Sequence, residues 1–231
     1  MLKRLPLILL TMALAVGAHA ETTAEKWVSD LGKSATLLQA GQYERSLKIS
    51  ERMLREMIDQ LGRGDAAMRI FGGALTHKAL ALAGLGREED ALWYWHSVLT
   101  LDPAFEKSDL SSFGDAGAFL AANRDPRKPW ILPEGGGQPL TAEFTAPKTI
   151  KQVKPKFPRG AQFFGVEGVL VVSVMITREG TVRAPVVRKA LPAPTLSYVA
   201  LEAIRQWRFQ PATKNGAPIE VQFDLSVNFK P

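Results

Sequence analysis

The residues with the most distinctive spacing form an alternating run near the carboxyl terminus, and the chemistry they offer is backbone hydrogen bonding. From Ile219 to Phe229 every second residue is apolar and the intervening residues are polar. This period of two places the apolar side chains on one face of a strand. We expect part of this strand to overhang its neighbour at a sheet edge, where unpaired N–H and C=O groups can bind an extended peptide. The expected partner-binding residues are Ile219, Glu220, Val221, Gln222, Phe223, Asp224, Leu225, Ser226, Val227 and Asn228.

Catalytic and metal-binding chemistry finds little support in the remaining residues. The chain contains no cysteine, which excludes thiolate catalysis and cysteine-based metal sites. Of its 3 histidines, His77 and His96 lack the spacing of metal ligands, and we expect them to be surface or helix-packing residues. The sequence contains no serine-hydrolase, zinc-protease or phosphate-binding motif. It therefore predicts a protein that is not an enzyme, with no cofactor and no metal.

The first twenty residues have the pattern of a secretory signal peptide. Lys3 and Arg4 precede an apolar run from Leu5 to Val16, which closes on the small-residue pattern of Ala18 to Ala20. As a helix this run would span about 18 Å, less than the ~30 Å of a hydrocarbon core. We expect residues 1–20 to be removed and the mature chain to reside in the periplasm, with an uncleaved anchor as the alternative.

The charge distribution divides the remaining chain into two parts. Residues 21–124 carry 12 Lys and Arg against 15 Asp and Glu, whereas residues 150–231 carry 12 against 5. This asymmetry indicates two domains with different surfaces. The basic part favours an acidic protein, anionic lipid headgroups or a cell-wall polymer as its partner, and no motif indicates nucleic acid.

Apolar residues at helical spacing run through residues 21–124. They predict one helix from Tyr43 to Leu61 and a second helix that ends at Leu101, just before Pro103. The second helix and its glycine turn resemble half of a tetratricopeptide repeat, and a degenerate earlier copy begins at Gly41. A further helix, from Phe105 to Leu120, is expected to cover the open end. The concave face of such repeats could bind a partner or serve as a scaffold.

Residues 125–149 are rich in proline and glycine and predict a linker. Residues 150–231 follow with an αββαβ pattern, so the whole chain is predicted to be α+β. The first strand ends at Ile176, and the second contains Pro185, which cannot donate a ladder hydrogen bond and should lie at an edge. A helix capped by Thr195 precedes the alternating strand. We expect a three-stranded antiparallel sheet with helices on one face and the alternating strand at its second edge.

Several motifs in residues 150–231 together resemble the carboxyl-terminal domain of the TonB family. They are Phe157-Pro158, Gly168-Val169, the turn from Glu179 to Val182, the segment from Ala200 to Pro211, and Gly216-Ala217-Pro218 before the last strand. The resemblance implies that the last strand accepts a short segment of an outer-membrane transporter, the TonB box. Many members have Gln-Pro-x-Tyr-Pro where this chain has the residues from Lys154 to Pro158.

The expected function is therefore that of a periplasmic TonB-like protein in the cell envelope, which binds a transporter or another envelope protein through its last strand. With residues 1–20 removed, such a protein could bind a transporter but could not pull on it. The alternative is an envelope scaffold whose repeats bind other proteins and whose carboxyl-terminal domain forms a homodimer. Nucleic acid is not an expected partner, and membrane association is expected only if the amino-terminal segment is retained.

Overall fold

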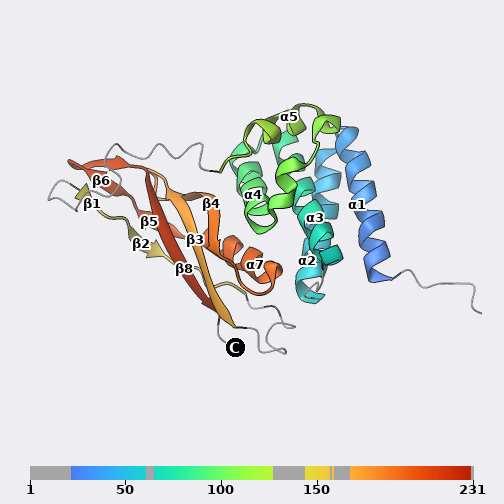
Figure 1. Cartoon of the computed structure of the whole chain (residues 1–231). Helices are drawn as coiled ribbons and strands as arrows, with labels where there is room; N and C mark the ends of the chain where they lie inside the picture. The colour runs from blue at the N-terminus through green and yellow to red at the C-terminus, as the bar shows by residue number, and fades with distance from the viewer. Residues whose placement is uncertain (1–21, 61–64, 127–143, 157, 159–166, 230–231) are drawn as a thin grey trace, which may run out of the picture.

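The computed structural model describes residues 22–60, 65–126, 144–156, 158 and 167–229 of the chain. An amino-terminal helical domain packs against a carboxyl-terminal sheet domain, with one helix of the sheet domain between them (Figure 1). The predicted α+β fold is confirmed. Among the described residues no helix has the length and apolarity needed to cross a bilayer. The predicted signal peptide, residues 1–20, lies outside the described residues.

The helical domain is built around one central helix, α3. Its helices are α1 (Thr23–Gln39), α2 (Tyr43–Gln60), α3 (Asp65–Gly84), α4 (Glu88–Leu101) and α5 (Gly114–Ala122), with two short 3-10 helices, η1 (Pro103–Lys107) and η2 (Ser111–Phe113). Helix α3 contacts α1, α2, α4 and α5. Its side chains are apolar on several faces, and Phe71, Leu75 and Leu82 are almost completely buried, as expected for a helix with neighbours all around it.

The predicted helix starting at Tyr43 and the predicted helix ending at Leu101 are both present, but the single helix expected from Phe105 to Leu120 is wrong. The region is divided into short helices, and an aspartate before each 3-10 helix accepts a hydrogen bond from a backbone N–H near the start of that helix. Asp102 Oδ1 accepts from Ala104 N at 3.1 Å, and Asp109 Oδ1 accepts from Ser111 N at 2.9 Å.

The sheet domain contains the expected three-stranded antiparallel sheet. Its strands are β3 (Gly168–Ile176), β4 (Val182–Lys189) and β8 (Val221–Phe229), in the order β4-β3-β8. Strand β3 is central because it is apolar on both faces, and Leu170, Val172 and Val174 are completely buried. Helix α7 (Pro194–Ile204) lies between this sheet and the helical domain (Figure 1). Thr195 does not cap α7, since the helix begins one residue earlier, at Pro194.

Five shorter strands, which the sequence pattern did not reveal, complete the domain. They are β1 (Phe144–Thr145), β2 (Lys148–Lys151), β5 (Arg208–Gln210), β6 (Ala212–Lys214) and β7 (Ala217–Ile219), paired as β1-β6-β7 and β2-β5. The β3–β4 turn is joined to β5 where Phe209 N donates to Gly180 O at 2.9 Å. Gly180 has a φ of 75°, and a Cβ there would overlap the Phe209 carbonyl, so only glycine fits this turn.

The two domains share one continuous core. Phe71 of α3 and Tyr198 of α7 meet edge to face, with ring centroids 5.5 Å apart. Helix α4 contacts both β4 and α7, and α2 contacts α7. The helical domain thus covers the outer side of α7, which explains why α7 is buried on nearly all sides.

Candidate functional site

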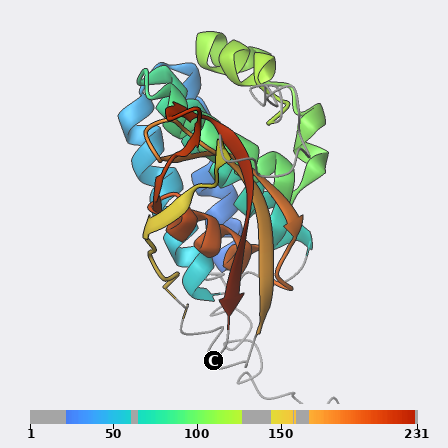
Figure 2. The ribbon, with the colours of Figure 1, turned by 90° about the vertical axis from the view of Figure 1, so that its left-hand side faces the viewer.

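The outer edge of β8 is the first candidate site. This strand pairs with β3 over its whole length, from Val221 opposite Ile176 to Phe229 opposite Gly168. The predicted overhang is therefore wrong, because both strands contain 9 residues. In the described part of the chain no strand pairs with the other side of β8. Figure 2, viewed from the side of the sheet, shows β8 running the length of the domain in front of the helices.

The structure places most, but not all, of the predicted partner-binding residues on this strand. Val221 to Asn228 lie on β8, whereas Ile219 ends β7 and pairs with Ala212 of β6. Glu220 lies at the junction and forms an ion pair with Arg183 of β4. The alternating pattern continues through this junction, so it could not show that the chain changes its partner strand there.

The two faces of β8 differ as the alternation predicts. Val221, Leu225 and Val227 are buried in the core. The polar residues on the opposite face, Asp224, Ser226 and Asn228, are exposed, whereas Gln222 and Phe223 are half-buried. A strand with one packed face keeps a fixed register, so its outer edge is held ready for a further strand.

A hydrogen-bonded row on the polar face crosses the sheet and engages Asp224. Ser173 Oγ of β3 donates to Asp224 Oδ1, and Arg188 Nε of β4 donates to Ser173 Oγ at 2.8 Å. Because this row links all three strands, Asp224 stabilises the sheet as well as facing solvent. Its backbone remains part of the candidate edge.

The opposite edge of the sheet, β4, is closed to strand addition. Pro185 has no N–H to donate, and Ala184 has a φ of 51° at an irregularity in the strand. Val187 N donates to Thr100 Oγ1 of α4 at 3.3 Å, so a side chain of the helical domain occupies this edge. Of the two edges of this sheet, β8 is therefore the one suited to accept a partner strand.

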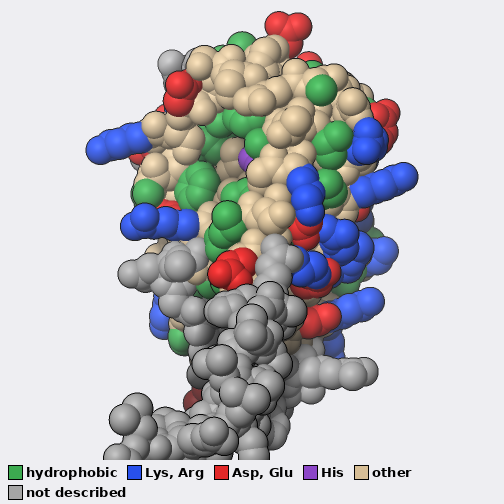
Figure 3. Space-filling model, turned by 90° about the vertical axis from the view of Figure 1, so that its right-hand side faces the viewer, with side chains coloured by type: hydrophobic (Ala, Val, Ile, Leu, Met, Phe, Trp, Pro, Cys, Tyr) green, Lys and Arg blue, Asp and Glu red, His purple; other side chains and the backbone are tan. Residues whose placement is uncertain are grey.

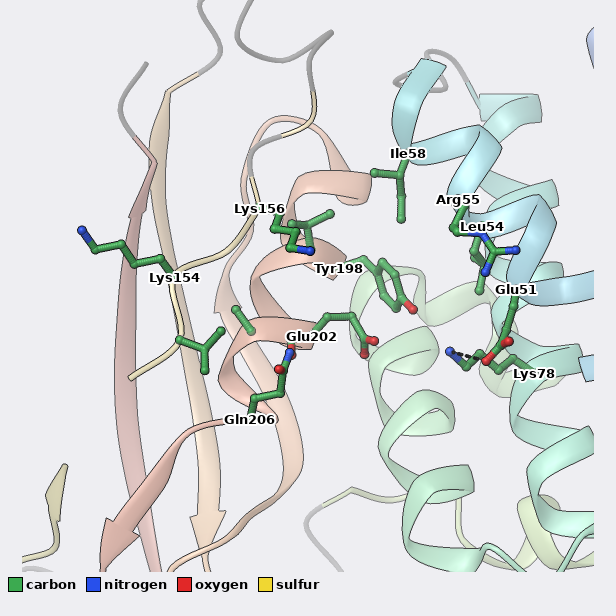
Figure 4. A pocket seen from close by; sticks show the side chains of 13 residues that line it. Glu51, Leu54, Arg55, Ile58, Lys78, Lys154, Lys156, Tyr198, Glu202 and Gln206 are labelled. Carbon is green, nitrogen blue, oxygen red and sulfur yellow. Dashed lines mark hydrogen bonds and ion pairs between the residues drawn. The ribbon is translucent and has the colours of Figure 1, made fainter. Parts of the chain in front are cut away.

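A second candidate site is a cavity of about 440 Å³ between the domains. Figure 4 shows Tyr198 and Glu202 of α7 facing Glu51 and Arg55 of α2 and Lys78 of α3. Lys78 Nζ lies 3.5 Å from Glu51 Oε1. The same ammonium lies 4.0 Å from the centroid of the Tyr94 ring, which adds a cation–π contact.

Burial changes the acidity of the groups around this cavity. It raises the pKa of Glu202, an effect that the Lys78 ammonium and the Tyr94 hydroxyl partly oppose. Burial also lowers the pKa of Lys78, against the opposing effect of Glu202 and Glu51. These groups come from both domains and are already paired with one another. Their arrangement holds the domains together.

The Tyr94 hydroxyl connects this cluster to a further contact between the domains. It donates to Glu202 Oε2 at 3.1 Å and accepts from Arg205 Nη1 at 2.9 Å. Arg205 also forms an ion pair with Asp90 of α4. Tyr94 and Asp90 belong to the helical domain, whereas Glu202 and Arg205 belong to the sheet domain. The hydroxyl is thus the shared centre of the polar contacts between them.

Comparison with known proteins decides the family of the sheet domain. Residues 153–231 match the family described as Gram-negative bacterial TonB protein C-terminal. These residues form a TonB C-terminal domain. The match covers the sheet, α7 and β8, whereas the helical domain lies outside it.

The curated relatives of this TonB C-terminal domain include Protein TonB of Vibrio cholerae, which is 28% identical over 109 residues, 47% of this chain and 44% of the relative. Protein TonB of Yersinia enterocolitica is 32% identical over 72 residues, 31% of this chain and 28% of the relative. This chain thus spans less than half the length of these relatives. The solution NMR structure of the Pseudomonas aeruginosa TonB CTD shows 26% identity and a TM-score of 0.33, covering 39% of this chain and 89% of that one.

Sequence reasoning missed the residues between the domains. Tyr94, Lys78 and Glu202 lie in helices whose apolar spacing assigned them to no particular site. The available signal was the aromatic and charged content of the face of α4 that includes Asp90 and Tyr94, on a helix otherwise rich in core residues. The TonB C-terminal domain therefore meets the helical domain through residues that only the tertiary structure brings together.

Proposed function

We propose that this chain is a periplasmic envelope protein that binds a partner protein by strand addition to β8. The observation that carries the proposal is the contrast between the two edges of the sheet. The α4 side chain of Thr100, together with Pro185, closes the β4 edge, whereas β8 has its partner strand on one side only among the described residues.

The proposed partner is a short extended segment of an outer-membrane transporter, the TonB box, as the family resemblance implies. Such a segment would form main-chain hydrogen bonds along β8, and each is worth about 0.5–1.5 kcal/mol. Its side chains on one face would lie beside Asp224, Ser226 and Asn228, which are exposed. The backbone would supply the affinity and these side chains the selectivity.

The role proposed here for both domains is binding. The helical domain contacts α7 and β4, on the side of the sheet away from the β8 edge. A transporter segment on β8 and a partner on the helical domain could therefore be held by one molecule.

Proline substitution tests the proposal, because it removes a single backbone N–H. Consecutive residues of a strand direct their N–H groups to opposite edges, so only one of Asp224→Pro and Leu225→Pro affects the outer edge. We expect the outer-edge variant to weaken binding of a TonB-box peptide by up to about tenfold in a calorimetric titration, the loss of one main-chain hydrogen bond. Asp224→Ala keeps every backbone N–H of the edge and is the control for loss of the side chain alone, so it should lose less affinity than the outer-edge proline variant.

Unchanged peptide affinity in both folded proline variants would refute strand addition at β8. Sedimentation of the unmodified chain provides the second test. A dimer that the outer-edge proline variant converts to a monomer would instead favour the scaffold alternative, in which β8 pairs with a second copy. The mass of the mature chain would show whether residues 1–20 are removed.

A further inference from the structure

A strip of basic side chains lies on the small strands of the sheet domain and on the segment that follows β2. Residues 144–156 and 203–219 contain no Asp or Glu. Within them we define the basic strip as the exposed residues Lys148, Ile150, Lys151, Lys154, Arg208 and Lys214. In the described part of the chain no ion pair joins any of its five cations to a carboxylate. Their charge is therefore available to an anionic partner.

The pairing of β2 with β5 concentrates this charge on one face. Lys151 lies directly opposite Arg208, and Lys148 lies opposite Gln210. Side chains directly opposite in an antiparallel pair project from the same face, and like charges there destabilise the pair. Arg208 and Gln210 are exposed, while Phe209 between them is buried, so this face points outward. An anion bound there would relieve the repulsion between Lys151 and Arg208.

One exposed apolar residue stands among these cations. The register of β2 shifts between Thr149 and Lys151, which leaves Ile150 as an extra residue without a cross-strand partner. Its side chain is 71% exposed, and the other exposed large hydrophobic side chain of the described residues is Val28, at 58%. An apolar side chain between two lysines suits a partner in which anionic groups border an apolar layer, as they do at a bilayer surface.

The position of the strip leaves it free to approach a flat surface. Strands β1, β2 and β6 lie on the side of the molecule remote from the helical domain (Figure 1). The face of the helical domain that points away from the sheet carries scattered basic and acidic side chains (Figure 3). The concentration of one sign of charge is thus a feature of the sheet domain.

We propose that the basic strip binds the surface of a bilayer that contains anionic phospholipids. The four lysines and Arg208 lie near the lipid headgroups, and Ile150 enters the interface between headgroups and acyl chains. Each basic side chain near such a surface strengthens binding by about fivefold. A cell-wall polymer would contact the cations but offers no apolar layer for Ile150.

The absence of cysteine permits a direct test in the full chain. A single cysteine at Ile150→Cys carries an environment-sensitive fluorophore, and Val28→Cys, the other exposed apolar position, carries the same label as the matched control. Vesicles of phosphatidylglycerol mixed with phosphatidylcholine should shift the emission of the label at position 150 to shorter wavelength and leave the label at position 28 unchanged. Pure phosphatidylcholine should shift neither. Membrane binding through any other segment of the chain would occur in both labelled variants, so it would not by itself shift the label at position 150 alone.

Charge substitutions test the electrostatic part. Lys148→Gln combined with Lys151→Gln should lower partitioning into the anionic vesicles by about 25-fold. Lys48→Gln combined with Lys107→Gln removes the same net charge from exposed residues of the helical domain and should leave partitioning within about twofold. Equal losses in the two pairs would overturn the proposal. It would also be overturned by an unshifted label at position 150, or by binding to insoluble cell-wall polymer without binding to vesicles.

Discussion

Replacing Tyr94 with phenylalanine removes one oxygen atom from the contact between the domains. The ring remains, and with it the contact to Lys78 at 4.0 Å. What is lost is the hydroxyl that donates to Glu202 Oε2 at 3.1 Å and accepts from Arg205 Nη1 at 2.9 Å. The variant therefore isolates two polar contacts between the domains without changing the apolar packing.

The expected loss can be estimated from the partners of this hydroxyl. A hydrogen bond to a charged group is worth about 1.5–3 kcal/mol. The Arg205 side chain is 30% exposed, so water replaces part of that contact. The Glu202 carboxylate is largely buried, and its Oε1 has no hydrogen-bond partner among the described residues. We expect Tyr94→Phe to lower the free energy of unfolding by about 2–3 kcal/mol.

The loss should depend on pH in a defined direction. Burial raises the folded-state pKa of Glu202 above its usual value of 4.5, and the Tyr94 hydroxyl opposes that shift by binding the charged form. Without the hydroxyl, this pKa rises further. A raised folded-state pKa contributes stability below the unfolded value, and that stability is lost as the pH increases through the folded value. The effect of Tyr94→Phe should therefore be larger at neutral pH than near pH 4.5.

Equilibrium urea denaturation, followed by tryptophan fluorescence, measures this difference in both domains at once. Trp95 reports on the helical domain and Trp207 on the sheet domain. Tyr43→Phe is the matched control, because Tyr43 is a half-buried tyrosine of the same domain whose hydroxyl makes no hydrogen bond within the described residues. A loss in Tyr94→Phe below about 0.5 kcal/mol, equal to that of the control, would refute the reasoning.

Two further predictions concern the turn and the buried histidines. Gly180→Ala should lower the free energy of unfolding by at least about 2 kcal/mol in the same assay, whereas Gly216→Ala, at a φ of 79° with open space around it, should cost about 1 kcal/mol. Burial lowers the pKa of His77 and of His96 to about 4, so the stability of the neutral forms is present above pH 6.5 and is lost as the pH falls toward 4. At pH 5.5 each buried histidine should therefore lower the free energy of unfolding by about 1.4 kcal/mol relative to its value at higher pH. His77→Phe should remove one half of this pH dependence, and an unchanged pH dependence of stability in that variant would contradict the prediction.

The three-stranded sheet was predictable because its residues follow strict patterns. The apolar run of β3 required a central position, Pro185 required an edge, and the alternation of β8 required one packed face. Each of these patterns is local in sequence, and each has one structural solution once the sheet has three strands. The strand order β4-β3-β8 follows from them.

The small strands were not predictable in the same way. Strand β2 is exposed along its whole length, so it has no alternation of apolar and polar residues to reveal it. It forms because β5 offers a partner, and β5 is held in turn by the hydrogen bond from Phe209 N to Gly180 O. A pairing that depends on two distant segments leaves no periodic signal in either of them.

Helix α7 is buried on more sides than its sequence indicated. A helix that packs on a sheet is expected to bury one face, whereas the structure buries Tyr198 and Leu201 in addition to Leu196 and Ile204. The helical domain supplies this second cover, and nothing in the sequence of α7 alone shows which domain will pack on it. For the same reason the contacts of Tyr94 with Glu202 and Arg205 could not be foreseen.

The closure of the β4 edge has a consequence for stoichiometry. A sheet with two open edges can accept a strand on each side, and copies of it can stack into a continuing array. In this sheet Pro185 and the contact from Val187 to Thr100 terminate one side. Strand addition at β8 therefore has a valency of one, and the complex with an extended peptide should contain a single peptide for each chain.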